Sequence, residues 1–159
     1  MKNVEYLGLK TDVVEDVTDR MNTLLGNYQI YYMNVRGFHW NIKGDMFFEL
    51  HEKFEELYTD ALKKIDEIAE RVKTLGATPV HSFSDYVEDS SIKEKRNITS
   101  GREAAESILD SLKILIEIER DVLSYAYEAK DEATIKLMGK YLTYQEKQVW
   151  MFNAFLGNK

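Results

Sequence analysis

Hydrophobic residues recur along most of this chain at alternating spacings of three and four positions. That spacing is the period of an α-helix that buries one face. Four stretches carry the pattern, and all are longer than an ordinary strand. They run from Val14 to Phe38, from Phe47 to Leu75, from Ile108 to Tyr125 and from Ile135 to Leu156. The pattern therefore predicts four long helices.

Turn and capping residues separate these stripes. Gly76 and Pro79 are typical of a helix that ends in glycine before a proline. Ser100 and Glu103 form a capping box that opens the third helix. Residues 77–99 have room for one short helix, and so long a connection usually packs on a neighbour. Two helices, a long crossover and two more helices predict an all-α, ferritin-like four-helix bundle.

Composition limits the class of protein. The 159 residues fit one domain, which we expect to span residues 1–159. The chain has no cysteine, so disulfides and thiolate metal sites are excluded. No apolar run approaches the roughly 18 residues that a membrane span needs, and the first residues have no apolar secretory core. We expect a cytoplasmic protein that does not enter a membrane.

Charge argues against a nucleic-acid partner. The formal net charge is −7, and the first ten residues carry only Lys2 and Lys10. Most of the affinity of proteins for DNA comes from neutralising phosphates. DNA binding is therefore expected to be absent or weak.

Two of the three histidines lie close together in the sequence. His39 and His51 are twelve residues apart, and Glu55 follows His51 by one helical turn. Such a pair also occurs as ordinary packing, so its meaning depends on what else could join it. Ferritin-like bundles bind a metal pair inside one chain with Glu-x-x-His motifs. Because Arg36, Phe48 and Thr78 precede the three histidines by three positions, a metal site would have to lie elsewhere.

The second helix offers further carboxylates. Asp66 and Glu70 fall on the same flank as His51 and Glu55, but Glu55 and Asp66 are roughly 16 Å apart along the axis. The two pairs are placed symmetrically about the point between positions 60 and 61. If a second copy of this helix packs antiparallel there, Glu55 of one chain faces Asp66 of the other. This arrangement predicts two equivalent metal sites per dimer, and His39 is close enough in the sequence to reach the same site. The simpler alternative is that Asp66 and Glu70 are solvated surface acids.

Two imidazoles and three carboxylates suit iron, zinc or manganese. Anionic oxygen ligands favour Fe³⁺ over Fe²⁺ by Coulomb attraction, so such a site would promote iron oxidation. We expect one or two iron ions per site, with Zn²⁺ or Mn²⁺ as competitors.

The stretch HWNIKGDMFFELHEKFEELYTDALKKIDEIAER resembles the signature of the Dps proteins, the mini-ferritins, and the resemblance extends over nearly the whole chain. It implies that two-fold dimers assemble into a hollow dodecamer that oxidises Fe²⁺, preferably with hydrogen peroxide, and stores ferric mineral. The ferroxidase ligands, which are both the catalytic and the metal-binding residues, would be His39, His51 and Glu55 of one subunit with Asp66 and Glu70 of its partner.

The chain departs from the family pattern at several points. Glu55 stands where the family usually has Asp, and the lysine-rich tail that members use to bind DNA is missing. Acidic pores are another family feature, and the candidates for an iron-entry pore are Glu128, Asp131 and Glu132. Lys136 occupies a position where another acid is expected.

Three functions are compatible with these patterns. The ligand set favours a ferroxidase that protects against oxidative damage. The alternatives are a DNA-compacting nucleoid protein and a non-enzymatic shell or adhesin with a vestigial metal site. Iron loading followed by a DNA gel shift would separate the first two.

Overall fold

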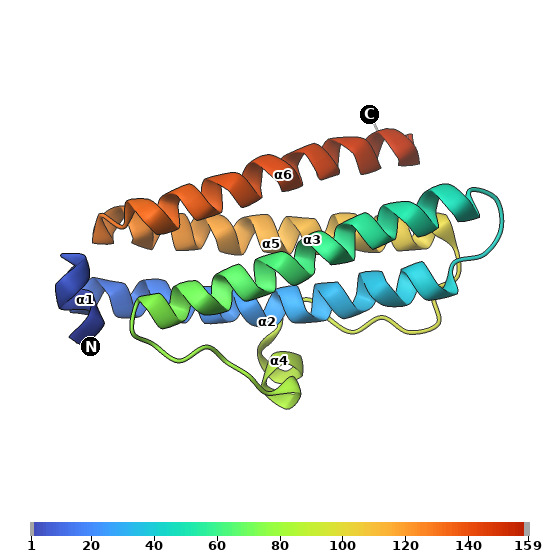
Figure 1. The fold of residues 1–159 in the computed structure, drawn as a ribbon. Coiled ribbons are helices and arrows are strands. Elements are labelled where there is room, and N and C mark those ends of the chain that lie inside the picture. Colours follow the sequence, from blue (N-terminus) through green and yellow to red (C-terminus); the bar gives the residue numbers. More distant parts are fainter. Residues whose placement is uncertain (1, 158–159) are drawn as a thin grey trace.

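The structure, a computed structural model, describes residues 2–157 as six helices and no strands within that range (Figure 1). The four long helices are α2 (Thr11–Asn41), α3 (Phe47–Thr74), α5 (Gly101–Ala129) and α6 (Glu132–Leu156). They lie side by side as an elongated bundle in which α2 packs on both α3 and α5, and α6 packs on α5. The predicted four-helix bundle is thus confirmed. None of these helices is long and apolar enough to cross a membrane among the described residues.

The predicted stripes form the core of the bundle. They are buried because each helix turns its apolar face toward the bundle axis. The largest fully buried side chains include Tyr28, Phe54, Ile108 and Tyr141, one from each long helix. Burial of these apolar side chains is the main contribution that holds the helices together.

The crossover between α3 and α5 returns the chain along the length of the bundle and contains the short helix α4 (Phe83–Asp89) (Figure 1). This confirms the predicted short helix. Three asparagines of α2 bind the backbone of the crossover. Asn22 accepts a hydrogen bond from Val80 N, while Asn27 accepts from Ile92 N and Asn34 from Lys95 N. These bonds satisfy backbone groups that would otherwise lack partners in an irregular segment.

The predicted helix ends are also present. The side chain of Ser100 accepts a hydrogen bond from Glu103 N, as the capping box requires. Gly76 has a positive φ of 89°, which favours glycine, and its N–H donates to Lys73 O at 2.9 Å. The helix α1 (Lys2–Leu7) was not predicted, because six residues are too short for a periodic pattern. Val4 is the buried side chain among its described positions 4–7.

Candidate metal centre

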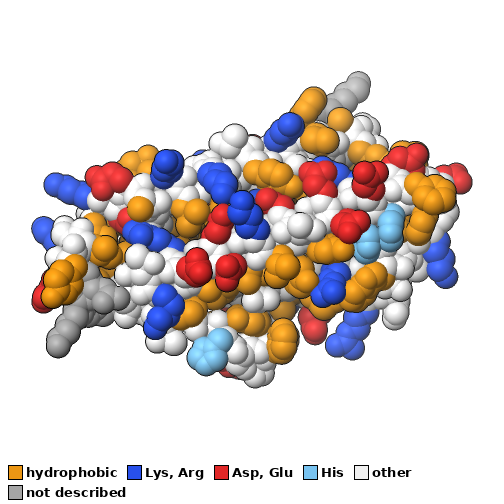
Figure 2. Space-filling view, viewed as in Figure 1, with side chains coloured by type: hydrophobic (Ala, Val, Ile, Leu, Met, Phe, Trp, Pro, Cys, Tyr) orange, Lys and Arg blue, Asp and Glu red, His pale blue; other side chains and the backbone are white. Residues whose placement is uncertain are grey.

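The turn between α2 and α3 brings two histidines together. His39 lies in the last turn of α2, and His51 lies near the start of α3. Their rings stack with centroids 3.7 Å apart and planes inclined by 15°. His39 is buried, whereas His51 is partly exposed. Figure 2 shows histidine at the end of the molecule where α2 and α3 meet, with acidic side chains close by.

Each histidine is oriented by the backbone of the other. His39 Nδ1 lies 2.7 Å from the carbonyl oxygen of His51, and His51 Nδ1 lies 2.8 Å from the carbonyl oxygen of His39. A carbonyl oxygen can only accept, so both Nδ1 atoms carry the proton. In the neutral imidazoles the lone pairs therefore reside on the Nε2 atoms, which is the arrangement that outer hydrogen bonds impose on metal-binding histidines.

Aromatic side chains pack around this pair. Phe47 stacks on the His51 ring at 5.1 Å, and Tyr58 meets His39 edge-on at 5.2 Å. Arg36 lies over the ring of Trp40 at 4.9 Å and donates a hydrogen bond to Tyr32. The packing restricts rotation of both imidazoles, so their orientation is set before any ligand binds.

The predicted carboxylates are not gathered by one chain. Glu55, Asp66 and Glu70 all lie exposed on α3. Their carboxylates make no hydrogen bond or ion pair within residues 2–157. No three histidine or acidic residues of the described chain form a group that could hold a metal ion. Of the five predicted ligands, a single chain brings together only the two histidines.

The pore candidates differ in their surroundings. Glu128 and Glu132 are exposed, but Asp131 is buried. Asp131 caps α6 by accepting from Thr134 N at 3.1 Å, and Arg71 donates to it at 2.6 Å. Burial alone would raise the pKa of Asp131, but the hydrogen bonds from Arg71 and Thr134 hold that pKa below its ordinary value. The carboxylate of Asp131 is thus engaged inside the chain, whereas the side chains of Glu128 and Glu132 face outward.

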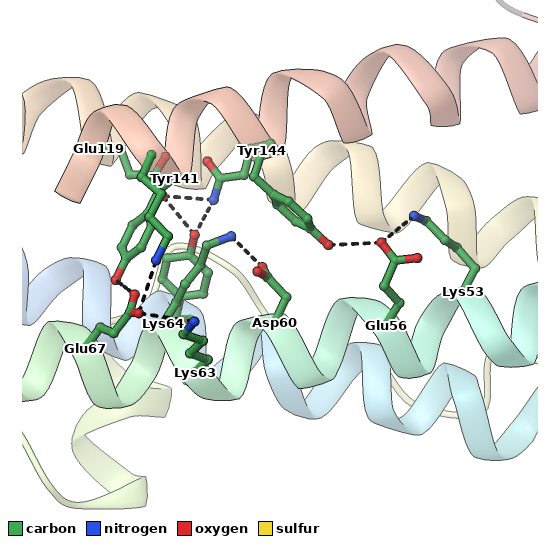
Figure 3. Close-up of polar contacts among 12 residues, drawn as sticks. Lys53, Glu56, Asp60, Lys63, Lys64, Glu67, Glu119, Tyr141 and Tyr144 are labelled. Atoms are coloured by element: carbon green, nitrogen blue, oxygen red, sulfur yellow. Dashed lines mark hydrogen bonds and ion pairs between the residues drawn. The ribbon is translucent and has the colours of Figure 1, made fainter. Parts of the chain in front are cut away.

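The sequence patterns missed a polar cluster in the middle of the bundle (Figure 3). We call it the core polar cluster, and it consists of Tyr28, Asp60, Lys64, Glu119 and Gln145. The sequence did contain an indication of this cluster. Lys64 and Glu119 occupy positions in phase with the buried residues of α3 and α5, where a charged side chain is unexpected.

Comparison with known proteins establishes the class. A family model for the ferritin-like domain matches residues 18–159, which include most of α2 and all of α3, α5 and α6. This class of protein combines a four-helix bundle with a long connection between its two helix pairs, as found here.

Individual relatives identify the family within the ferritin-like class. The DNA protection during starvation protein of Porphyromonas gingivalis is 42% identical, over 97% of this chain and 97% of that protein. The solved structure of a Dps protein from Vibrio cholerae is 50% identical, with a TM-score of 0.91 over 93% of each chain. A Dps protein from Bacillus brevis is 38% identical, with a TM-score of 0.88 over 92% of this chain and 99% of that one. The chain belongs to the Dps family.

Proposed function

We propose that this protein oxidises Fe²⁺ at sites shared between two copies of the chain and stores the ferric product inside a hollow shell. The ligands of each site are His39, His51 and Glu55 of one chain with Asp66 and Glu70 of its two-fold partner. The observation that carries the proposal is the pair of stacked histidines, whose mutual hydrogen bonds leave both Nε2 lone pairs for a metal ion.

The carboxylates support a site completed by a second chain. Charged groups are rarely left without a partner at a place that becomes buried. Glu55, Asp66 and Glu70 have none within residues 2–157, and the first two are roughly 16 Å apart along α3. An antiparallel α3 across a two-fold axis would bring Asp66 and Glu70 to the histidines and would do so twice.

The chemistry follows from the donor set. Carboxylates and neutral imidazoles bind iron in either oxidation state, but anionic oxygens stabilise Fe³⁺ more. Two Fe²⁺ ions give one electron each to a molecule of hydrogen peroxide, which is reduced to two molecules of water with the uptake of two protons. Because no single-electron product of peroxide is released, hydroxyl-radical formation is avoided. Each site takes one or two iron ions, with zinc and manganese as competitors.

The shell that stores the product is proposed to be a dodecamer built from two-fold dimers. Several large apolar side chains are exposed on the single chain, including Trp40, Phe48, Leu62 and Trp150. Figure 2 shows such side chains scattered among charged ones on one face. Assembly into a shell would bury part of this apolar surface, which is favourable. Glu128 and Glu132 remain candidates for the iron-entry route.

The name of the Porphyromonas gingivalis relative refers to DNA protection. We propose that this chain protects DNA by removing Fe²⁺ and peroxide together, rather than by compacting DNA. The net charge of −7 favours this route, because an acidic surface repels phosphates. A DNA-compacting protein and a shell with an inactive metal site are the competing functions.

Mixing two inactive variants tests the shared site. One carries His51→Ala and Glu55→Ala, and the other carries Asp66→Ala and Glu70→Ala. In an assembly of either variant alone, every site lacks part of its ligands. A mixed dimer contains one site with all four substitutions and one site with none. Co-assembly from dissociated chains should therefore restore about a quarter of the wild-type rate of Fe²⁺ oxidation for random pairing.

The matched control mixes two variants with damage on the same half of the site. His39→Ala combined with the His51→Ala, Glu55→Ala chain leaves every site broken, so no activity should return. If the first mixture also fails to recover activity, the ligands do not come from two chains. Full activity in each unmixed variant would instead show that these residues are not the ferroxidase site.

A further inference from the structure

The core polar cluster lies among the four long helices (Figure 3). Each long helix contributes at least one of its members: Tyr28 from α2, Asp60 and Lys64 from α3, Glu119 from α5 and Gln145 from α6. Burying charged groups in an apolar core is costly unless each finds a partner. Lys64 is only 4% exposed and Glu119 is 0% exposed, so their partners decide what this cluster can do.

Lys64 places a positive charge inside the bundle. Its Nζ donates to Asp60 Oδ2 at 2.5 Å. The same ammonium lies over the ring of Tyr144 at 4.0 Å from the centroid, and at 5.2 Å from that of Tyr141. A carboxylate and two aromatic faces are the surroundings that stabilise a desolvated cation.

Glu119 brings a carboxyl group to the same region, and one of its oxygens has no partner among the described residues. Its Oε1 accepts from Tyr28 and from Gln145 Nε2, both at 2.8 Å. Its Oε2 and the Oε1 of Gln145 have no hydrogen-bond partner among the residues that the structure describes, although both are buried. Buried acceptors of this kind are rare in folded proteins. Burial raises the pKa of Glu119 to about 7, whereas the hydrogen bonds from Tyr28 and Gln145 and the charge of Lys64 oppose that rise.

Oxygen atoms converge on this region from all four helices as carboxylates, an amide and a phenol. Hard divalent cations prefer such oxygen ligands. Ferritin-like bundles in general bind metal in the bundle core with carboxylates from facing helices. In this chain the Lys64 ammonium already supplies a cation there, and a fixed positive charge at that depth repels a second one.

We propose that the core polar cluster is a cation site occupied by the chain's own Lys64 ammonium, and that this lysine keeps divalent metal ions out of the bundle. The inference goes beyond the proposed ferroxidase function. It assigns Lys64 a role in deciding where metal binds. Because the lysine excludes divalent ions from the interior of each chain, they can bind only at sites outside that interior.

The test substitutes Lys64→Met, which removes the charge but keeps an unbranched side chain. The probe is Zn²⁺, which is not oxidised. After loading and dialysis of the assembled protein, elemental analysis should find about one zinc ion per chain more than in the wild type. That extra ion should disappear when Glu119→Gln is added. Lys63→Met is the matched control, because Lys63 is exposed on the same helix and should leave the zinc content unchanged.

Two further measurements make each outcome decisive. The experiment is repeated in the His51→Ala, Glu55→Ala background, where the extra zinc should persist even if the proposed ferroxidase site is wrong. If Lys64→Met does not fold in metal-free buffer, refolding is attempted with Zn²⁺. Recovery of helical circular dichroism only with zinc supports the proposal. A zinc content equal to wild type, or failure to fold with and without zinc, overturns it.

Discussion

At the scale of single residues, the two histidines of the α2–α3 turn differ from an ordinary packed pair. Their Nδ1 atoms are both used by backbone carbonyls, so each ring is anchored on one edge and offers only Nε2 on the other. The third histidine, His81, is exposed, and within residues 2–157 its ring bonds only to Pro79 O of its own segment. Position in the fold, rather than residue type, therefore distinguishes the candidate ligands.

We expect His51→Ala to lower the rate of Fe²⁺ oxidation by at least about tenfold while the helices and the assembly persist. Loss of groups that merely orient metal ligands already costs this much. Peroxide-dependent oxidation of Fe²⁺ by the purified assembly measures the effect. His81→Ala is the control and should match the wild type. A collapse of helical circular dichroism in His51→Ala would show that His51 is structural.

Glu119 makes the stability of the fold depend on pH. Its pKa rises from 4.5 to about 7 because burial disfavours the charged form. The folded state therefore binds a proton more tightly than the unfolded state between these values, so stability falls as the pH rises through this window. Glu119→Gln should remove this component, which is worth roughly 3 kcal/mol.

The measurement is the midpoint of guanidinium unfolding for both proteins between about pH 5 and about pH 8. The wild type should lose stability relative to Glu119→Gln across this range. Glu117→Gln, an exposed position on the same helix, should follow the wild type. Parallel pH profiles for wild type and Glu119→Gln would contradict the assignment.

At the scale of elements, the end of α3 is fastened to the turn between α5 and α6. Arg71 of α3 donates to Asp131 and to Thr134, so one partly buried ion pair connects helices that are distant in the sequence. The same Asp131 caps α6. Ion pairs on the protein surface contribute less to the free energy of unfolding than this pair, because water screens them.

We expect Asp131→Ala to destabilise the protein by about 3 kcal/mol, because it leaves Arg71 unpaired and removes the cap of α6. Chemical unfolding monitored by circular dichroism measures the loss. The control is Asp121→Ala, which breaks the exposed pair with Arg20 and should cost less than about 1 kcal/mol. Equal losses of stability in the two variants would show that burial of the Asp131–Arg71 pair does not increase its contribution to stability.

The helices could be predicted from sequence because periodicity is a local property. The four long helices, the short helix of the crossover and the cap at Ser100 were all predictable in this way. The stacking of His39 on His51 was not, since it depends on the angle at which α2 and α3 meet. The structural role of Asp131 was also hidden, because its partner Arg71 is 60 residues away. The five-residue ligand set remains a prediction, because it needs a second chain.

At the scale of the whole molecule, negative charge dominates the surface available to partners. Acidic residues number 28 against 21 lysines and arginines, and assembly into a shell would repeat this excess in every subunit. Binding to DNA without sequence preference depends on neutralised phosphates and weakens steeply with salt.

We expect no retardation of duplex DNA by the assembled protein at about 0.15 M salt, where surface charges are already screened within about 8 Å. An electrophoretic shift assay on iron-free and iron-loaded protein measures binding. Iron uptake by the same preparation is the control for correct assembly. Tight retardation that resists added salt would favour a DNA-compacting protein.

The mutual anchoring of His39 and His51 also bears on repeated use of the site. A ferroxidase must take up Fe²⁺ and release its product many times, and side chains that collapse between cycles would slow each return. Neither imidazole can turn without breaking a hydrogen bond to the other residue's backbone. In the proposed ferroxidase, the two imidazoles would therefore keep their orientation when the site is empty, and the arrival of iron and oxidant would limit the rate of turnover.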